Sequence, residues 1–415
     1  MTPRLARDPL PSGLALTQLD PAFREDPHPR LDRLRRDAPV YWDAAFGHFF
    51  VTAYPIARAI LTDLTFLRDP AGAAPEANHT RIAERRARTE APIGGMAQLD
   101  DPDHARVRRP IARALNARML QAEPLVRDVV RTHLANLTAD EVDLISAFAV
   151  PIPSDVIALV LGVDRGDLVR FRAWSEALIK IFHPARSSGD LLAIARARRD
   201  VGRYLAAVLR ARRERPADDL VSDLVALQTA GEPLSDEEIL VNCQALLVAG
   251  NLTTADLIGN ATWLLLRHPG ERARMASEPD HVDAIVEETL RLESPVDITV
   301  RIAPDARDLH GCPVARRQAV TLSLKAANRD PAVYAGPDLF LPGRTASPHL
   351  AFGGGAHICI GRPLARLEAR LALSTLFARF PHMTLADPAG SPDWRETPFF
   401  HGLRSLRVRL GRSVS

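Results

Sequence analysis

The sequence predicts a mainly α-helical fold with small β-sheets, an α+β protein in which helices dominate. Long helical patterns run through most of the chain from about Asp103 onward. Strand-like stretches are short, and the clearest are residues 48–53 (HFFVTA), 319–324 (AVTLSL) and 405–410 (SLRVRL). A single very long helix is the third observation that favours a helical protein.

That long helix is predicted to begin at Ser235 and to continue to about Arg267. The Ser235 side chain caps its first turn, and Glu238, three residues later, completes a capping box. His268, Pro269 and Gly270 then end the pattern. About 32 residues give a length of about 48 Å at 1.5 Å per residue. Because residues 244–250 (QALLVAG) are apolar almost all round, the helix must cross the protein interior.

Prolines and irregular patterns mark the connections between elements. The 33 prolines lie mostly near the N-terminus and in connectors, as at Pro151 and Pro153, where they punctuate helices. Residues 68–100 have no clear period and mix Gly, Ala, Pro and Arg, which suggests a mobile loop.

Composition describes one globular domain over residues 1–415. No long Gly/Ser-rich linker, obvious internal repeat or break in composition divides the 415 residues, and 46% hydrophobic with 25% charged residues allow an ample core. A net charge of +2 gives no overall attraction to nucleic acid. Residues 1–21 contain only a four-residue apolar run, too short for a signal peptide or a membrane span. The three cysteines are too few and too scattered for a disulfide framework, so we expect a cytoplasmic protein.

One of these cysteines, Cys359, lies in a glycine-dense loop, residues 352–361 (FGGGAHICIG), that opens into a helical pattern. Glycines let a main chain approach a planar cofactor, and Pro363 fits the first turn of the following helix. The positive end of that helix is expected to lower the pKa of the thiol, and a thiolate is a metal ligand. A buried structural cysteine, a zinc site and a phosphate-binding loop are alternatives. A phosphate loop would continue into Gly-Lys-Ser/Thr, and structural zinc needs about four ligands where only His357 is near.

The loop resembles the haem-ligand loop of the cytochrome P-450 family, whose pattern is Phe-x-x-Gly-x-x-x-Cys-x-Gly. The match falls at Phe352, Gly355, Cys359 and Gly361. The resemblance implies the cytochrome P-450 fold, a triangular-prism helical domain with haem b buried between the long central helix and the cysteine loop. Cys359 is then the axial ligand.

Two further segments extend this resemblance upstream of the cysteine. Residues 287–296 (EETLRLESPV) are similar to the family's Glu-x-x-Arg helix at Glu288 and Arg291, and residues 327–331 (ANRDP) follow. Residues 339–344 (LFLPGR) resemble the segment whose arginine, here Arg344, completes an ion-paired triad. A buried triad of this kind fixes geometry, whereas an ordinary surface pair would contribute under about 1 kcal/mol.

The resemblance also implies the haem contacts. Residues 100–110 (DDPDHARVRRP) are similar to the helix that supplies a histidine and an arginine to a haem propionate. Buried propionates need cationic or donor partners, whereas each such residue taken singly is more often a solvated base. The implied cofactor-binding residues are His104, Arg108, Ala249, Arg301, Phe352, His357, Cys359 and Gly361.

Residues 249–254 (AGNLTT) resemble the family's oxygen-handling segment, Ala-Gly-x-Asp/Glu-Thr-Thr. There a glycine and a threonine hydroxyl, here Gly250 and Thr253, disturb the helix and make room for oxygen. The alternative is a threonine that bonds back to the carbonyl one turn earlier.

Leu252 stands where the family usually has an acid, and leucine cannot carry a proton. Asp256, about one turn later on the same face, and the adjoining Asn251 are therefore predicted to organise waters instead. Alternatively, Asp256 pairs with a surface cation.

The helix after Cys359 carries Arg362, Arg366 and Arg370 at four-residue intervals, and Arg106 and Arg109 extend this basic stripe. An acidic electron donor, a ferredoxin, would be attracted to the Cys359 side of the protein. A solvated helix face, partly neutralised by Glu368, explains the pattern equally well.

The resemblance places the substrate near the 85–100 loop and several mostly apolar positions, with Thr299 or His401 able to orient a polar group. Core packing explains the same residues equally well. The predicted pocket residues are Met96, Leu178, Phe182, Leu246, Val296, Thr299, Phe399 and Phe400.

Together these features imply a haem-thiolate monooxygenase that inserts one oxygen atom of O2 into a hydrophobic small molecule, by hydroxylation or by O- or N-dealkylation. Electrons would come from NAD(P)H through a separate ferredoxin reductase and ferredoxin, with no nucleic-acid or membrane partner. The residue Leu252 raises an alternative, a haem-thiolate enzyme that uses peroxide or needs no external electrons. A haem-binding sensor is a third possibility.

Overall fold

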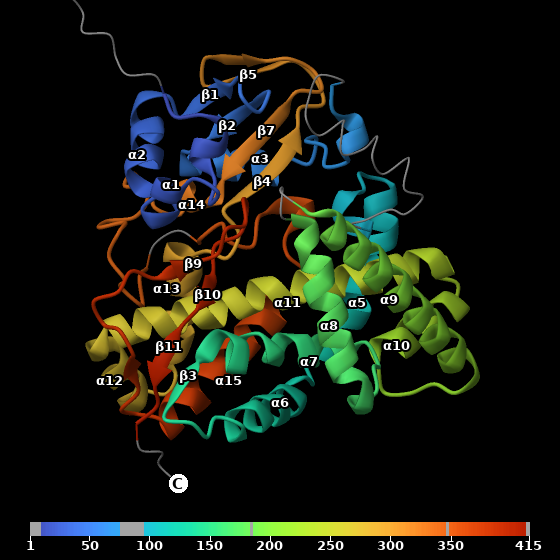
Figure 1. The fold of residues 1–415 in the computed structure, drawn as a ribbon. Coiled ribbons are helices and arrows are strands. Elements are labelled where there is room, and N and C mark those ends of the chain that lie inside the picture. Colours follow the sequence, from blue (N-terminus) through green and yellow to red (C-terminus); the bar gives the residue numbers. More distant parts are fainter. Residues whose placement is uncertain (1–9, 75–94, 183–185, 346–347, 412–415) are drawn as a thin grey trace, which may run out of the picture.

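The computed structural model describes residues 10–74, 95–182, 186–345 and 348–411. A sheet with its flanking helices forms one layer, and most of the helices form a second, larger layer that α11 (Asp236–Arg267) crosses (Figure 1). The predicted mainly helical fold with small sheets is confirmed.

Four strands form the main sheet in the order β1, β2, β7, β4. Their bounds are Val40–Asp43, His48–Val51, Ala319–Ser323 and Ile298–Ile302, respectively. β2 runs parallel to β7, and β4 runs antiparallel to β7, with Arg301 opposite Val320. Successive side chains of a strand point to opposite faces. Phe50 of β2 accordingly packs with Leu34 of α2, and Val51 packs with Ile60 of α3.

Helices on both faces cover this sheet and bury all of β2 and β7. They are α1 (Pro21–Glu25), α2 (His28–Asp37), α3 (Tyr54–Thr62) and α14 (Leu324–Ala327). The sheet therefore fixes the position of β4, the strand that carries Arg301.

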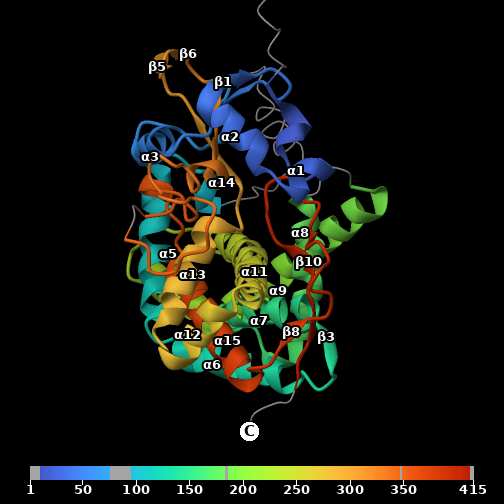
Figure 2. The same ribbon diagram turned by 90° about the vertical axis from the view of Figure 1, so that its left-hand side faces the viewer.

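The central helix α11 forms as the sequence predicts. The Ser235 hydroxyl accepts a hydrogen bond from Glu238 N (3.1 Å), and the Glu238 carboxylate accepts one from Ser235 N (2.8 Å). Seen nearly end-on in Figure 2, α11 lies in the middle of the surrounding helices. Its position makes it a rigid wall for whatever the interior binds.

The helices around α11 share amphipathic faces that pack inward. They are α5 (Asp103–Met119), α6 (Glu123–Ala135), α7 (Pro151–Val160), α8 (Leu168–Ile179), α9 (Ser188–Glu214), α10 (Leu220–Thr229), α12 (Pro269–Ser277), α13 (His281–Leu292) and α15 (Arg362–Arg379). One continuous core joins them, with fully buried side chains such as Ile111, Phe148 and Leu247.

Short turns connect these helices. They are η1 (Gly13–Leu16), η2 (Pro70–Gly72), η3 (Gly95–Gln98), η4 (Ile145–Ala149), η5 (Arg165–Asp167), η6 (Lys180–Phe182) and η7 (Gly355–His357). The predicted loop over residues 68–100 is described only at its two ends, where η2 and η3 lie, and residues 75–94 fall outside the described part.

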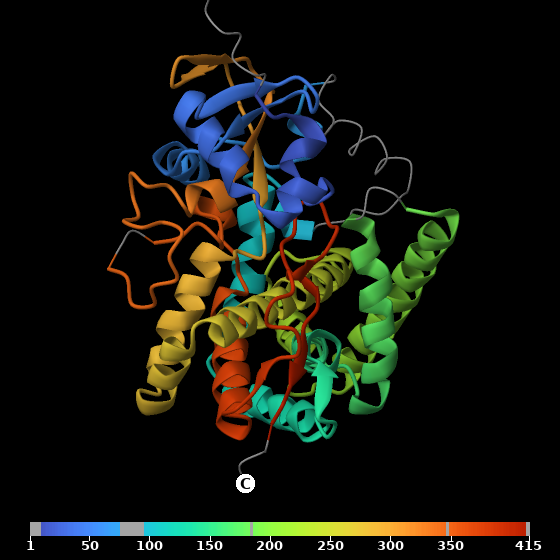
Figure 3. The same cartoon turned by 60° about the vertical axis from the view of Figure 1, so that its left-hand side comes forward.

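The remaining strands are short. β3 (Glu141–Asp143), β11 (Arg407–Arg409) and β8 (Thr384–Leu385) form one sheet, β9 (Asp393–Trp394) pairs with β10 (Leu403–Ser405), and β5 (Arg307–Leu309) pairs with β6 (Cys312–Val314). The β9–β10 segment passes across α11 (Figure 3), and β10 contacts that helix. The three predicted strand-like stretches overlap β2, β7 and the β10–β11 segment, and each runs one or two residues past the observed strand.

None of the helices formed by the described residues combines the length and the apolar character that crossing a membrane requires.

Candidate functional site

The glycine-dense loop around Cys359 is closed by its own backbone. Cys359 N donates to Phe352 O (2.9 Å), and the turn η7 lies between them. As predicted, α15 begins just after the cysteine, with Pro363 in its first turn. Cys359 therefore stands at the N-terminal, positively polarised end of a long helix.

Glycine is required at position 355 because the loop packs closely against the end of α3 there. Its φ is +63°, and a Cβ there would lie 2.3 Å from Leu61 O at the end of α3. At Gly361, by contrast, a Cβ would meet no atom within 4 Å. The glycine at 355 thus lets the loop pack against α3, whereas the sequence analysis assigned all the glycines to the approach of a ring.

The Cys359 thiol differs from expectation in its acidity. The side chain is exposed, yet the surrounding protein limits hydration of a thiolate, and this desolvation raises the pKa of Cys359 above its ordinary value. Backbone N–H groups of Gly361 and Arg362 and the guanidinium of Arg108 act in the opposite direction without prevailing. The predicted net lowering of the pKa by the helix end and the loop N–H groups is therefore wrong for the protein alone, and a cation bound to the sulfur would favour the thiolate.

Four basic residues from three separate segments gather beside this loop. His104 and Arg108 come from α5, Arg301 from β4 and His357 from η7. The rings of His104 and His357 lie with their centroids 4.0 Å apart, and Arg108 Nη2 donates to Ile358 O (2.6 Å). The structure therefore brings together all four residues that were predicted to contact propionates.

Electrostatics in this cluster indicate an anion site. Burial, with His104 and Arg301 next, lowers the pKa of His357 to about 3, and burial, with Arg68 next, lowers the pKa of Arg301 to about 9. His104 Nε2 and His357 Nδ1 are buried without a hydrogen-bond partner. Such groups are costly unless a ligand satisfies them. A cavity of about 90 Å³ opens beside His104, Arg301 and His357.

Arg68 also belongs to this neighbourhood, although the sequence analysis missed it. Its Nη1 donates to Thr299 Oγ1 (2.7 Å) and Val300 O (2.8 Å) of β4. No motif marks it, and only the fold brings it next to Arg301.

A strip of α11 is open in the middle of an otherwise buried helix. Ala249 is exposed, and Gly250 and Thr253 are half-buried. The Thr253 hydroxyl donates to Ala249 O (2.9 Å), which is the back-bonding alternative considered above. The helix remains a regular α-helix throughout, so the predicted disturbance at Gly250 and Thr253 is wrong. The Thr253 oxygen still has lone pairs directed away from the backbone.

The three residues around Thr253 are engaged elsewhere. Leu252 is buried, and Asn251 Nδ2 donates to Ser175 Oγ of α8 (2.7 Å). Asp256 forms an ion pair with Arg395, and burial, opposed by Arg395, raises the pKa of Asp256 to about 7. Asp256 thus follows the cation-pairing alternative, although one of its oxygens is buried without a partner.

The predicted triad forms, with Glu288 and Arg291 buried and Arg344 half-buried. Arg291 binds both carboxylate oxygens of Glu288 (2.8 Å each), and Arg344 Nε binds one of them (2.8 Å). Leu341 N donates a fourth hydrogen bond to Glu288 (2.9 Å). The Arg291 guanidinium continues to the carbonyls of residues 328, 337 and 339. The triad therefore fixes the chain that leads into the cysteine loop.

Matches to known proteins extend over nearly the whole chain. A family description of cytochrome P-450 matches residues 192–393. The biotin biosynthesis cytochrome P-450 of Bacillus subtilis is 33% identical over 394 residues, which cover 92% of this chain and 95% of that protein. The cytochrome P-450 monooxygenase PikC of Streptomyces venezuelae is 34% identical over 411 residues, 97% of this chain and 95% of its own. The chain belongs to the cytochrome P-450 family. The solved structure of the cytochrome P-450 PksS of Bacillus subtilis matches with a TM-score of 0.84 at 29% identity and covers 95% of this chain and 99% of that one.

As a P-450 monooxygenase, the protein carries haem on a cysteine thiolate. The residues present fit that cofactor. The basic cluster offers guanidinium groups and unsatisfied imidazole nitrogens to two propionates, and the family motif places Cys359 as the thiolate. Ala249 on the open strip of α11, with Phe352 and Gly361 in the cysteine loop, completes the predicted set.

The predicted pocket residues come from separated segments of the P-450 fold. Leu246 precedes the open strip of α11, and Val296 forms a β-bridge with Phe400. Met96 and Leu178 are buried, Phe399 is exposed, and the side chain of Phe182 lies outside the described residues. Thr299 Oγ1 accepts hydrogen bonds from Arg68 and Arg301, which engages both lone pairs of its oxygen and leaves only its O–H to donate to a substrate.

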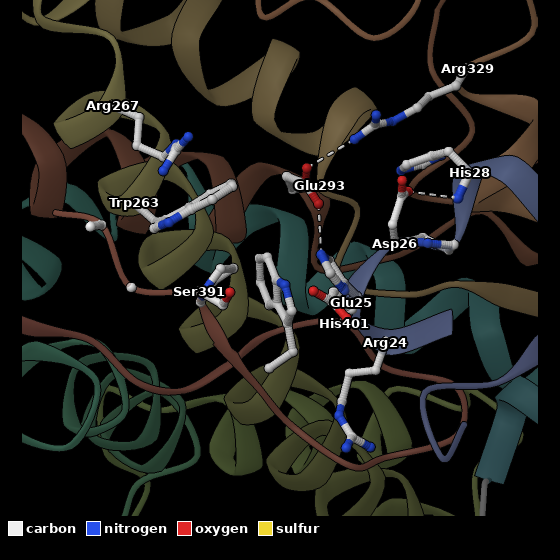
Figure 4. A pocket seen from close by; sticks show the side chains of 15 residues that line it. Arg24, Glu25, Asp26, His28, Trp263, Arg267, Glu293, Arg329, Ser391 and His401 are labelled. Carbon is white, nitrogen blue, oxygen red and sulfur yellow. Dashed lines mark hydrogen bonds and ion pairs between the residues drawn. The ribbon is translucent and has the colours of Figure 1, made fainter. Parts of the chain in front are cut away.

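His401 does not orient a substrate. Its Nε2 is hydrogen-bonded to Glu293 (2.6 Å), which also pairs with Arg329, and its ring lies tilted against that of Trp394 with the centroids 4.0 Å apart. His401 lines a cleft of about 400 Å³ with Trp263, and neither Cys359 nor the basic cluster contributes to it (Figure 4). The predicted role of His401 is therefore wrong.

The basic stripe is largely neutralised. Arg366 forms a bidentate pair with Glu287 (2.6 and 2.8 Å), and Arg370 pairs with Glu123 (3.4 Å). Arg106 is bound to Glu238 of α11 (2.6 Å).

Glu368 is not one of the neutralising carboxylates. It is buried, and that burial raises its pKa well above the ordinary value. Within the described ranges, Arg362 and Arg109 are exposed and form no ion pair.

Proposed function

We propose that the protein hydroxylates or dealkylates a hydrophobic small molecule, with O2 as co-substrate and with electrons that originate from NAD(P)H. The observation that carries the proposal is the meeting of the Cys359 loop with the four basic residues, which together suit a haem and its two propionates. When bound, the haem supplies the activation of O2 for insertion into a C–H bond.

Within this proposal, the open strip of α11 receives O2 and the reacting part of the substrate. Gly250 leaves space, and Thr253 Oγ1 accepts and passes a proton beside O2. Leu252 cannot do this, so Asp256, one turn beyond Leu252 on the same helix face and with a pKa raised by burial to about 7, supplies the proton. Asn251 acts indirectly by fixing α11 against α8 through Ser175.

The variants Thr253→Ala and Asp256→Asn test these assignments. Each should increase the fraction of NADPH electrons released as hydrogen peroxide, because O2 reduction loses its ordered proton supply. Thr262→Ala is the control, since the Thr262 hydroxyl makes the same one-turn back-bond to Ile258 O (2.8 Å) elsewhere on α11. Equal peroxide release from the Thr253 and Thr262 variants would remove Thr253 from the mechanism.

The apolar side chains predicted to line the substrate pocket support a hydrophobic substrate. Leu178, Leu246, Val296 and Phe400 offer few polar partners, so binding would rest on apolar surface removed from water. A spin-state screen of lipophilic and charged compounds tests this. Lipophilic compounds should shift the haem absorbance, and a response confined to highly polar compounds would contradict the proposal.

An acidic ferredoxin is proposed to dock on the Cys359 side, through the unpaired Arg362 and Arg109. The double variant Arg362→Glu with Arg109→Glu should slow reduction by ferredoxin and reduce its salt dependence. Arg316→Glu, at an exposed arginine between β6 and β7, is the control. Unchanged reduction in the double variant would exclude this surface.

A peroxide-driven reaction is the second candidate, because Leu252 is buried and apolar where the family usually has an acid. Product formation from hydrogen peroxide without ferredoxin or reductase, at a rate no lower than that of the complete electron-transfer system, would favour it.

We also propose that residues 1–415 form a single domain in the reducing cytoplasm. The core cluster from Met96 to Leu410 and the main sheet, in which β1 and β2 pair with the later strands β7 and β4, support one domain. The free thiols of Cys243, Cys312 and Cys359 suit a reducing compartment. One calorimetric transition of the haem-loaded protein is expected, whereas two separate transitions would contradict a single domain.

A further inference from the structure

Arg68 joins the segment before α5 to β4. Its backbone N donates to Asp100 Oδ1 (2.6 Å), and its Nε donates to Ala97 O (3.2 Å). Its Nη1 reaches Thr299 Oγ1 (2.7 Å) and Val300 O (2.8 Å) on β4. One side chain therefore ties the 95–100 segment to the strand that carries Arg301.

The guanidinium groups of Arg68 and Arg301 lie side by side and share hydrogen-bond acceptors. Arg301 Nη1 donates to the same two acceptors, Thr299 Oγ1 (3.4 Å) and Val300 O (3.0 Å). In the described part of the chain, no carboxylate is hydrogen-bonded to either guanidinium. The two oxygens of Asp100 instead accept the backbone N–H groups of Arg68 and Asp69. Like charges this close are destabilising unless an anion is shared.

The charge of the whole cluster indicates how much negative charge a ligand would need to balance it. Arg68, Arg108 and Arg301 each bring a guanidinium group, which stays protonated in proteins. The nearby carboxylate of Asp100 offsets one guanidinium, and the exposed Asp101, 3.5 Å from His104, is hydrated. Two positive charges remain, and this is the charge that two propionates neutralise. Without Arg68 the two propionates would exceed the available positive charge.

We propose that Arg68 is a fifth propionate-binding residue in this chain and shares one haem propionate with Arg301. Through Ala97 O and Asp100, the same contact holds the 95–100 segment in place, so haem binding orders the wall of the pocket in which Met96 lies. The inference rests on the proposed haem site, and it adds a residue that the family motifs do not mark.

The test is a cycle of two protein forms and two cofactors. Parent and Arg68→Gln proteins are each reconstituted with haem and with haem dimethyl ester, in which both propionate charges are removed. Transfer of the cofactor to excess apomyoglobin is then followed. With haem, Arg68→Gln should lose its cofactor at least about tenfold faster, equivalent to about 1.4 kcal/mol. With the dimethyl ester, parent and variant should differ little.

Two further variants separate the effect of the positive charge of Arg68 from an effect on the fold. Arg68→Lys should restore much of the haem retention and of the reduction potential, which removal of the positive charge in Arg68→Gln should shift to more negative values. Arg317→Gln is the matched control, because Arg317 binds the nearby carbonyls of residues 71–73 without joining the cluster. It should leave haem transfer unchanged.

The outcomes are distinct. An equal effect of Arg68→Gln with both cofactors would overturn the proposal, because Arg68 would then act only on the fold. Unchanged haem transfer, with loss of the spin-state response to carboxylate compounds alone, would also overturn it and assign Arg68 to a substrate carboxylate. Failure of the parent protein to retain haem would instead contradict the haem site itself.

Discussion

The buried triad offers the sharpest test of how this fold is held together. The substitution Glu288→Gln removes one negative charge and almost no volume. In the parent, the carboxylate accepts two hydrogen bonds from Arg291, one from Arg344 and one from Leu341 N. After the change, two guanidinium groups in a nearly dry environment share a neutral amide. Its NH2 group is a hydrogen-bond donor, so it cannot accept from the guanidinium N–H groups.

The expected cost follows from that environment. Glu288 and Arg291 are 4% and 3% exposed, so water cannot replace the lost charge. Removing one partner of a buried ion pair typically costs about 3–5 kcal/mol. Because whole domains are stable by about 5–15 kcal/mol, this is a large share of the total. We therefore expect Glu288→Gln to unfold at much lower urea concentration and to lose the cysteine-loop geometry first.

The measurement is urea unfolding of the haem-loaded protein, followed by far-ultraviolet circular dichroism and by Soret absorbance. The matched control is Glu141→Gln, whose carboxylate also faces two arginines, Arg407 and Arg409, at the surface. That change should cost less than about 1 kcal/mol. Similar losses in the two variants would refute the reasoning, since burial would then not distinguish them.

Three other substitutions follow from local geometry. Gly355→Ala should weaken folding and haem retention, because φ is +63° and the new Cβ would lie 2.3 Å from Leu61 O. The control Gly270→Ala should not, because a Cβ there meets no atom within 4 Å. Equal haem retention in the two variants would contradict this prediction. Glu368→Gln should raise the unfolding free energy at neutral pH, because the pKa of the buried carboxyl is raised from 4.5. That advantage should grow by up to about 1.4 kcal/mol per pH unit above pH 4.5 and vanish below it; a pH-independent difference would contradict this. Ser235→Ala should cost about 1 kcal/mol in denaturant unfolding through loss of the capping box, and no change would show that the cap contributes nothing.

Features confined to a short segment were predictable from the sequence. The capping box of Ser235 and Glu238 spans four residues, and the geometry that defines it is local to one helical turn. Pro363 likewise marks the start of α15 within a few residues of Cys359. Hydrophobic patterning predicted the long central helix for the same reason, because each helical turn repeats the pattern.

Contacts between distant segments were not predictable in this way. Arg68 and Thr299 are 231 positions apart, and Asp256 and Arg395 are 139 apart. Sequence spacing put Asp256 one turn beyond Leu252 on the same face of α11, and both are buried, but it could not show that the β9–β10 segment brings Arg395 to Asp256. The partner determines whether the carboxylate is a surface charge or a buried one.

Charge patterns in the sequence led to wrong predictions where packing against neighbouring helices determines which charges are paired or buried. Arg366 and Glu368 are two residues apart on α15, yet Arg366 binds Glu287 of α13 and Glu368 faces the core. The acidity of Cys359 was misjudged for a related reason, because helix polarity is visible in sequence and desolvation by the folded protein is not. In both cases the missing information is which surfaces pack together.

The most direct measurement of the central claim is the carbon monoxide difference spectrum of the reduced, haem-loaded protein. The parent should show the long-wavelength Soret band of thiolate-ligated haem, Cys359→Ser should lose it, and Cys312→Ser should keep it. If Cys359→Ser retains the same band as the parent, Cys359 is not the haem ligand and the account of the site is contradicted.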